Sequence, residues 1–108
     1  MAQDFERHIA QATGITAVAV FTSDSNDAVI SIRLANIAAT SITTDVYITS
    51  GVLDYYLVKG ITIPSGSSLE LIDGASRFVV QSGDVLKVVS DTASSLDTWV
   101  SVVDAISA

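Results

Sequence analysis

Side chains branched at Cβ dominate this sequence. Valine, isoleucine and threonine together supply 35 of the 108 residues, and their restricted χ1 rotation favours the pleated, half-buried backbone of a β-strand. Residues of one kind also recur at every second position: Ile42, Thr44, Val46 and Ile48 share one parity, and the polar Asp45 and Thr49 have the other. Successive side chains of a strand point to opposite faces. The sequence therefore predicts strands with one buried face, and no long helix competes with them.

Turn-forming residues divide this pattern at intervals of roughly 8 to 12 residues, the spacing of an antiparallel sandwich or barrel. The clearest turns are the polar stretch 23–27, the Pro64-Ser65-Gly66 segment and the polar stretch 90–95. The strand-like segments are 5–9, 15–21, 28–34, 42–49, 69–71, 77–81, 85–90 and 96–103, with residues 55–59 and 61–63 as a ninth. We count eight or nine short strands among them, with the turns Asp73-Gly74 and Ser82-Gly83-Asp84 on either side of segment 77–81.

Segment 28–34 has the most regular alternation. Four apolar residues share the face that we expect to be buried: Ala28, Ile30, Ile32 and Leu34. Ser31 and Arg33 lie on the opposite face, which we expect to be exposed.

These segments predict one all-β domain, an antiparallel β-sandwich of jelly-roll-like or Ig-like topology with about eight or nine short strands. The sandwich is expected over residues 15–108. Residues 1–14 are expected to form an N-terminal arm or a first strand. An arm adds a strand to the sheet edge of a neighbouring molecule, whereas a first strand pairs within its own sandwich. Both alternatives stay open at this point.

The charge balance excludes several function classes. A net charge of −7 argues against nucleic acid or anionic lipid as a partner, because both bind basic surfaces. The absence of cysteine excludes a disulfide framework and a thiolate zinc site within these residues. Asp4, Glu6 and Arg7 interrupt any signal-peptide core, and no apolar run approaches the length of a spanning helix. We expect no contact with nucleic acid or membrane.

Candidate catalytic residues are few. The single histidine, His8, stands beside Glu6 and Arg7 with no nucleophile placed by a motif, whereas general acid or base catalysis needs a positioned partner and a pocket. The segment 24–27 (Asp-Ser-Asn-Asp) offers oxygen ligands for calcium but lacks the glycine and the bidentate glutamate of an EF-hand loop. We therefore expect no enzyme activity, no cofactor and no bound metal.

Exposed aromatic residues are the candidates for binding. Trp99 shares its parity with Asp97 and Ser101, so it is exposed, covered by a neighbouring subunit or packed in the core. The candidate protein-interface residues are Phe5, Arg7, His8, Ile9, Tyr55, Tyr56 and Trp99. The rings of Tyr55, Tyr56 and Trp99 also suggest a second class of function, a glycan-binding adhesion module.

Three motifs occur in order along the chain: SxxLDYYLVKG, IPSGSSLELIDG and QSGDVLKVVSDTASSLDTWVSVVDAIS. From about Ala28 to Ser107 the series resembles small virion structural proteins of tailed bacteriophages, most closely those of T4-like phages of marine cyanobacteria. The resemblance implies a structural protein of the virion that is made in the host cytoplasm. Its expected role is a capsid decoration or cement protein, or a neck, tail or baseplate component. The implied partners are major capsid or tail proteins, with multiple copies or a homo-oligomer.

Overall fold

Eight β-strands and no helix make up the described part of the chain. The structure is a computed structural model that describes residues 4–104, with the backbone alone at Asp4 and at 72–77. The strands are β1 (Asp4–Thr13), β2 (Val18–Thr22), β3 (Asp27–Asn36), β4 (Ile42–Ser50), β5 (Leu53–Ile63), β6 (Ser68–Val80), β7 (Val85–Ser90) and β8 (Leu96–Asp104). All pairings are antiparallel, which confirms the predicted fold class. Residues 4–104 hold no helix long and apolar enough to cross a membrane.

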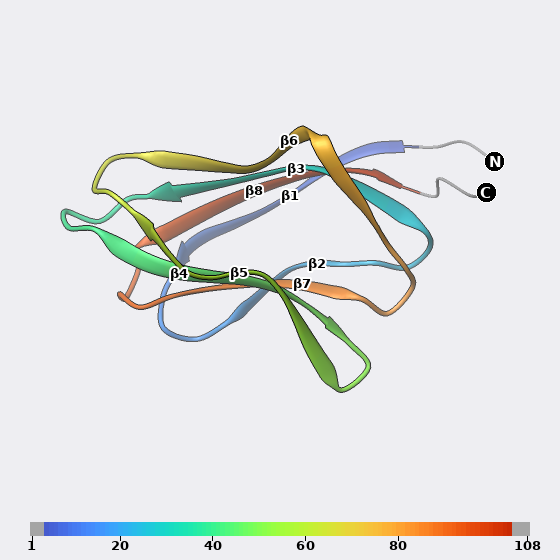
Figure 1. Cartoon of the computed structure of the whole chain (residues 1–108), viewed down its shortest axis with the longest axis horizontal. Coiled ribbons are helices and arrows are strands. Elements are labelled where there is room, and N and C mark those ends of the chain that lie inside the picture. Colours follow the sequence, from blue (N-terminus) through green and yellow to red (C-terminus); the bar gives the residue numbers. More distant parts are fainter. Residues whose placement is uncertain (1–3, 105–108) are drawn as a thin grey trace.

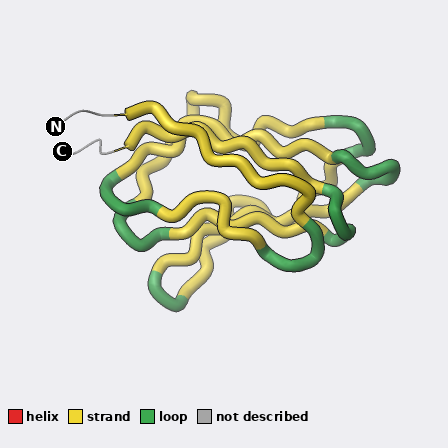
Figure 2. Tube along the Cα trace, turned by 180° about the vertical axis from the view of Figure 1, so that it is seen from behind, coloured by secondary structure: helices red, strands yellow, loops and turns green. Residues whose placement is uncertain are grey.

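The strand order defines a jelly roll. One sheet has the order β1-β8-β3-β6 and the other has the order β2-β7-β4-β5. Each strand of the first half pairs with its counterpart in the second half: β1 with β8, β2 with β7, β3 with β6, and β4 with β5. Eight strands paired in this way in two packed sheets form a jelly roll, one of the two topologies that the sequence left open. The two sheets appear as facing layers in Figures 1 and 2.

The core lies between the sheets and consists of inward-facing aliphatic side chains from both. Ile32, Val100 and Val102 come from one sheet, and Val46 and Val88 come from the other, all fully buried. The predicted alternation along segment 42–49 is confirmed, because the burial of β4 alternates along the strand. Burial of these side chains is the main stabilising term, at about 25 cal/mol per Å² of apolar surface.

The prediction for segment 28–34 was partly wrong. Ile32 and Leu34 are buried as expected, but Ala28 and Ile30 are only partly buried, and Val29 is fully buried instead. The pairing of β3 with β8 skips Ile30, which leaves two residues of β3 opposite one residue of β8. Beyond such a β-bulge, each residue of the strand points to the face opposite to the one that strict alternation predicts.

One pair of predicted strands is a single strand. Segments 69–71 and 77–81 join in β6, so Asp73-Gly74 is no turn, and residues 55–63 all lie in β5. Gly60 sits at a register shift of β5 with a φ of 72°. Its backbone N–H donates a hydrogen bond of 2.7 Å to Asp45 Oδ1. Glycine therefore suits this bulge, where positive φ is needed.

The N-terminal segment belongs to the sandwich. β1 pairs with β8 from Asp4 opposite Asp104 to Thr13 opposite Leu96, so it is the first strand of its own sheet. The predicted strand 15–21 begins later, at Val18, and the side chain of Ile15 is 71% exposed.

Candidate protein-interaction surface

The outer face of the β1-β8-β3-β6 sheet carries an exposed apolar and cationic surface. The strand register aligns Ile9, Trp99 and Arg33 in one row across β1, β8 and β3. The next row contains Arg7, Ser101 and Ser31. We define the Trp99 face as the exposed residues Phe5, Arg7, Ile9, Arg33 and Trp99. Phe5 is 80% exposed, Ile9 51% and Trp99 48%, so this face is unusually apolar for a surface facing water.

Trp99 lies at the centre of this face. The Arg7 guanidinium carbon is 5.3 Å from the centroid of the Trp99 ring, within the range of a cation–π contact. The position outside the core excludes one of the three alternatives that the sequence left for Trp99. The two remaining alternatives are a ring that stays exposed to solvent and a ring that another molecule covers.

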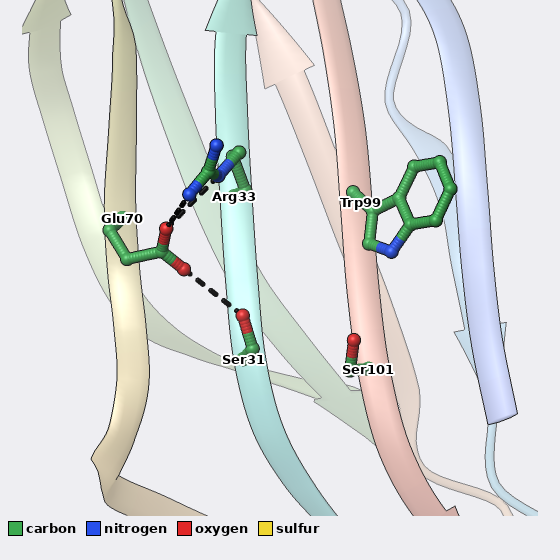
Figure 3. A pocket seen from close by; sticks show the side chains of 5 residues that line it. All are labelled: Ser31, Arg33, Glu70, Trp99 and Ser101. Atoms are coloured by element: carbon green, nitrogen blue, oxygen red, sulfur yellow. Dashed lines mark hydrogen bonds and ion pairs between the residues drawn. The ribbon is translucent and has the colours of Figure 1, made fainter. Parts of the chain in front are cut away.

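Arg33 is held by Glu70 of the neighbouring β6. Arg33 Nε donates a hydrogen bond of 3.0 Å to Glu70 Oε1, and Ser31 Oγ donates one of 3.0 Å to Glu70 Oε2 (Figure 3). The pair is exposed to solvent, so it contributes little to stability. Its effect is to neutralise and orient the Arg33 guanidinium beside Trp99.

Shallow depressions flank the indole ring. One of about 400 Å³ is lined by Ser31, Arg33, Glu70, Trp99 and Ser101 (Figure 3). Another of about 470 Å³ is lined by Ile9, Ala10, Gln11, Asp97, Thr98 and Trp99. Both are open, and their walls mix apolar and polar atoms. This geometry suits the side chains of a protein partner better than a buried small molecule.

His8 does not belong to the Trp99 face. It pairs with Val100, whose side chain points into the core, and its ring centroid is 4.5 Å from that of Phe21 on β2. His8 Nε2 lies 3.3 Å from Glu6 Oε1. The structure thus separates His8 from Arg7 and Ile9, with which the sequence analysis grouped it, because neighbouring residues of a strand face opposite ways.

The two tyrosines lie on a different part of the molecule. Residues 50–56, which we call the β4–β5 tip, form the end of a hairpin that extends beyond the sandwich (Figure 1). Tyr55 is 57% exposed and Tyr56 46%. Tyr56 stacks against Tyr47 with a centroid distance of 4.9 Å, and Lys59 Nζ lies 4.5 Å from the Tyr56 centroid. Burial raises the pKa of Tyr47, and the carboxylate of Asp54 adds to this rise.

The tip also carries exposed aliphatic residues that the sequence analysis did not select. Val52 is 95% exposed and Leu53 58%. Asp54 Oδ1 accepts a hydrogen bond of 2.7 Å from Thr49 Oγ1. Gly51 has a φ of 65°, which makes the turn between the strands. Adjacent apolar residues beside this turn glycine were the signal that could have revealed the tip.

The group of oxygen ligands predicted within segment 24–27 also includes a residue from another strand. Carboxylate oxygens of Asp24, Asp27 and Asp104 lie within 4.8 Å of one another, so β8 supplies a member that sequence spacing could not reveal. Asp27 accepts hydrogen bonds of 2.7 Å from Ser23 Oγ and 2.8 Å from Ser25 Oγ. A hydrogen bond with Asp27 raises the pKa of Asp104, and burial adds to this rise. Serine hydroxyl donors therefore hold the Asp27 carboxylate within this cluster.

Comparison with known proteins gives one structural match. No protein-family model and no curated protein matches the chain. A solved structure from Bacillus endospore appendages, described as disulfide-linked pili, superposes with a TM-score of 0.55 and 22% sequence identity. The alignment covers 94% of this chain and 84% of that chain. At this identity the match supports the fold.

The match contradicts the function expected from the phage resemblance. The chain superposes on a protein of a bacterial appendage, so the expected roles in a capsid, neck, tail or baseplate are wrong. The motifs that suggested them include turns such as Pro64-Ser65-Gly66 and strand segments such as β7. Jelly rolls in general use such elements, which makes them a weak guide to function. The resemblance of the motifs to those of phage virion proteins itself stays a prediction.

The glycan-binding alternative falls with the same prediction. Tyr55 and Tyr56 lie on β5, in the sheet opposite the one that carries Trp99 on its outer face. The three rings therefore do not form a common stacking platform. The prediction that the protein is not an enzyme stays a prediction.

Proposed function

We propose that this protein is a structural subunit that associates non-covalently with further copies of itself. The observation that carries the proposal is the exposure of Phe5, Ile9 and Trp99 together on one sheet face. Contiguous exposed apolar surface mostly marks a site of protein contact. Tryptophan and arginine are also the residue types that contribute most to binding energy at protein interfaces.

The structural match supports a role of this kind. The matched protein is described as forming pili, which are assemblies of many subunits. The same description states that those pili are disulfide-linked. The 108 residues of this chain contain no cysteine, so its contacts have to rest on packing, hydrogen bonds and charge. Many weak contacts repeated along an assembly supply stability without a covalent link.

Sedimentation velocity over a range of protein concentrations tests the proposal. The wild-type protein is expected to form larger species as concentration rises. Trp99→Thr keeps a strand-forming residue at this position and is expected to weaken association by about tenfold or more, as for an interface hot spot. Because Trp99 lies outside the core, the melting temperature of the monomer should change little.

Val89→Thr is the matched control. Val89 pairs with Asp45 in the other sheet, where it lies on the outer face and only partly buried. This substitution introduces the same residue type on the outer face of the other sheet, and it should leave association unchanged. A wild-type protein that stays monomeric at every concentration tested would overturn the proposed function.

A further inference from the structure

Two exposed apolar surfaces of this molecule face away from each other. The Trp99 face is the outer side of one sheet, and the β4–β5 tip extends from the other sheet on the far side of the sandwich (Figure 1). The two surfaces of one copy therefore cannot cover each other. We propose that the β4–β5 tip of one copy docks on the Trp99 face of the next copy, an inference that rests on the proposed self-association.

Charge complementarity supports this pairing. Arg7 stacks on Trp99, and no carboxylate among the described side chains forms an ion pair with it. Arg33, by contrast, is already neutralised by Glu70. Asp54 is the single charged residue of the tip, and it is exposed. The docked tip therefore brings the Asp54 carboxylate to the Arg7 guanidinium of the next copy. Carboxylates are the partners with which arginine pairs best.

The shapes and apolar groups also correspond. The tip presents Val52, Leu53 and Tyr55, each more than half exposed. The Trp99 face offers depressions of about 400 and 470 Å³ on either side of the indole ring. Insertion of the tip side chains there removes apolar surface from water on both partners, which favours association.

Contact between a tip and a face covers both kinds of exposed apolar surface, whereas contact between two faces covers only one. A pair of copies joined through their Trp99 faces leaves both tips exposed. A tip-to-face contact joins two different surfaces, so it is heterologous and continues from copy to copy. Each internal copy then has both surfaces covered. The tip spans only residues 50–56, whereas a standard interface involves about 20–30 residues on each side, so we expect a single contact to be weak and the row to depend on repetition.

Charge reversal tests the docked geometry. Arg7→Glu and Asp54→Arg place like charges opposite each other, and each is expected to weaken association about tenfold or more. A 1:1 mixture of the two variants restores association, because each tip then meets a face of opposite charge. Lys87→Glu, a reversal on the other sheet, is the control and should have no such effect. Circular dichroism and melting temperature verify that each variant is folded.

Introduced cysteines test which surfaces meet, since the chain has none of its own. Val52→Cys at the tip and Ser101→Cys on the Trp99 face are expected to form a disulfide-linked dimer when mixed under mild oxidation. Ser101→Cys alone should form no disulfide-linked dimer, although it should still associate non-covalently. A disulfide-linked dimer of Ser101→Cys alone indicates contact between two faces and overturns this inference.

The outcomes separate the two proposals. A wild-type protein that never associates contradicts the proposed function itself. A wild-type protein that associates, while the Arg7 and Asp54 variants associate equally well, leaves the proposed function standing and contradicts only the tip-to-face geometry. A mixture of the two charge variants that associates no better than either one alone also contradicts that geometry.

Discussion

Along β8, Val100 and Val102 point into the core and are fully buried, whereas Trp99 is 48% exposed on the outer face of the same strand. Along β3, Ile32 is fully buried and its neighbour Arg33 is exposed. The inward residues of this sheet therefore hold the sandwich together, and its outward residues are available to bind another molecule. Because the two sets alternate along each strand, stability and association should be separable by single substitutions.

The largest expected effect comes from a substitution at a side chain that points into the core. Ile32→Asp places a charge in the core and should destabilise the fold by several kcal/mol, enough to unfold a domain of this size. Arg33→Asp removes the exposed pair with Glu70 and should cost less than about 1 kcal/mol. Urea denaturation followed by circular dichroism measures both. Equal tolerance of the two substitutions would show that the assignment of faces is wrong.

A smaller effect of opposite sign is expected beside Trp99. Thr98 is buried, and its Oγ1 has no hydrogen-bond partner within the part of the chain that the structure describes. Thr98→Val keeps the shape and removes the unpaired hydroxyl, so it should raise the free energy of unfolding by about 1 kcal/mol. Association should not change, whereas Trp99→Thr should show the reverse pattern. A Thr98→Val variant that associates more weakly would contradict the separation of the two faces.

The smallest effects come from two aspartates, Asp104 at the end of β8 and Asp91 in the turn between β7 and β8. A hydrogen bond with Asp27 raises the pKa of Asp104 above its ordinary value of 3.8. The stability that Asp104 contributes is therefore fully present below pH 3.8 and is lost as pH rises through the raised pKa. Asp104→Asn cannot ionise and should raise the melting temperature at neutral pH.

Asp91 should behave in the opposite way. The backbone N–H of Thr43 and the hydroxyl of Thr92 lower the pKa of Asp91 below its ordinary value of 3.8. Its contribution is present above pH 3.8 and is lost as pH falls through the lowered pKa. Asp91→Asn should therefore lower the melting temperature at neutral pH. Melting temperatures of both variants across the acidic range test the pair, and equal shifts in the same direction would contradict this account.

Alternation along each strand was enough to predict the fold class and much of the core. It placed Ile32 and Leu34 inside, and it placed Trp99 on the face opposite Val100. It failed at Ile30, because a bulge depends on the partner strand and leaves no mark in the periodicity of its own strand. Turn-forming residues also misled at Asp73-Gly74, where β6 continues as one strand.

The candidate surface was harder to predict than the core. Phe5, Arg7, Ile9 and Trp99 were all selected from the sequence, but their common face depends on the pairing of β1 with β8. These strands lie at opposite ends of the described chain, so no local pattern shows that they are neighbours. The resemblance to phage proteins misled because its turn and strand motifs describe the scaffold, whereas function depends on the outer face.

Trp99 is the only tryptophan of the chain, so its fluorescence reports directly on the surface that we propose to be covered. The emission spectrum and its quenching by acrylamide can be measured as the protein concentration rises. We expect a shift of the emission to shorter wavelength and weaker quenching as the protein associates, with neither change in Arg7→Glu over the same range. An unchanged emission of Trp99 while sedimentation shows larger species would contradict the claim that copies meet on this face.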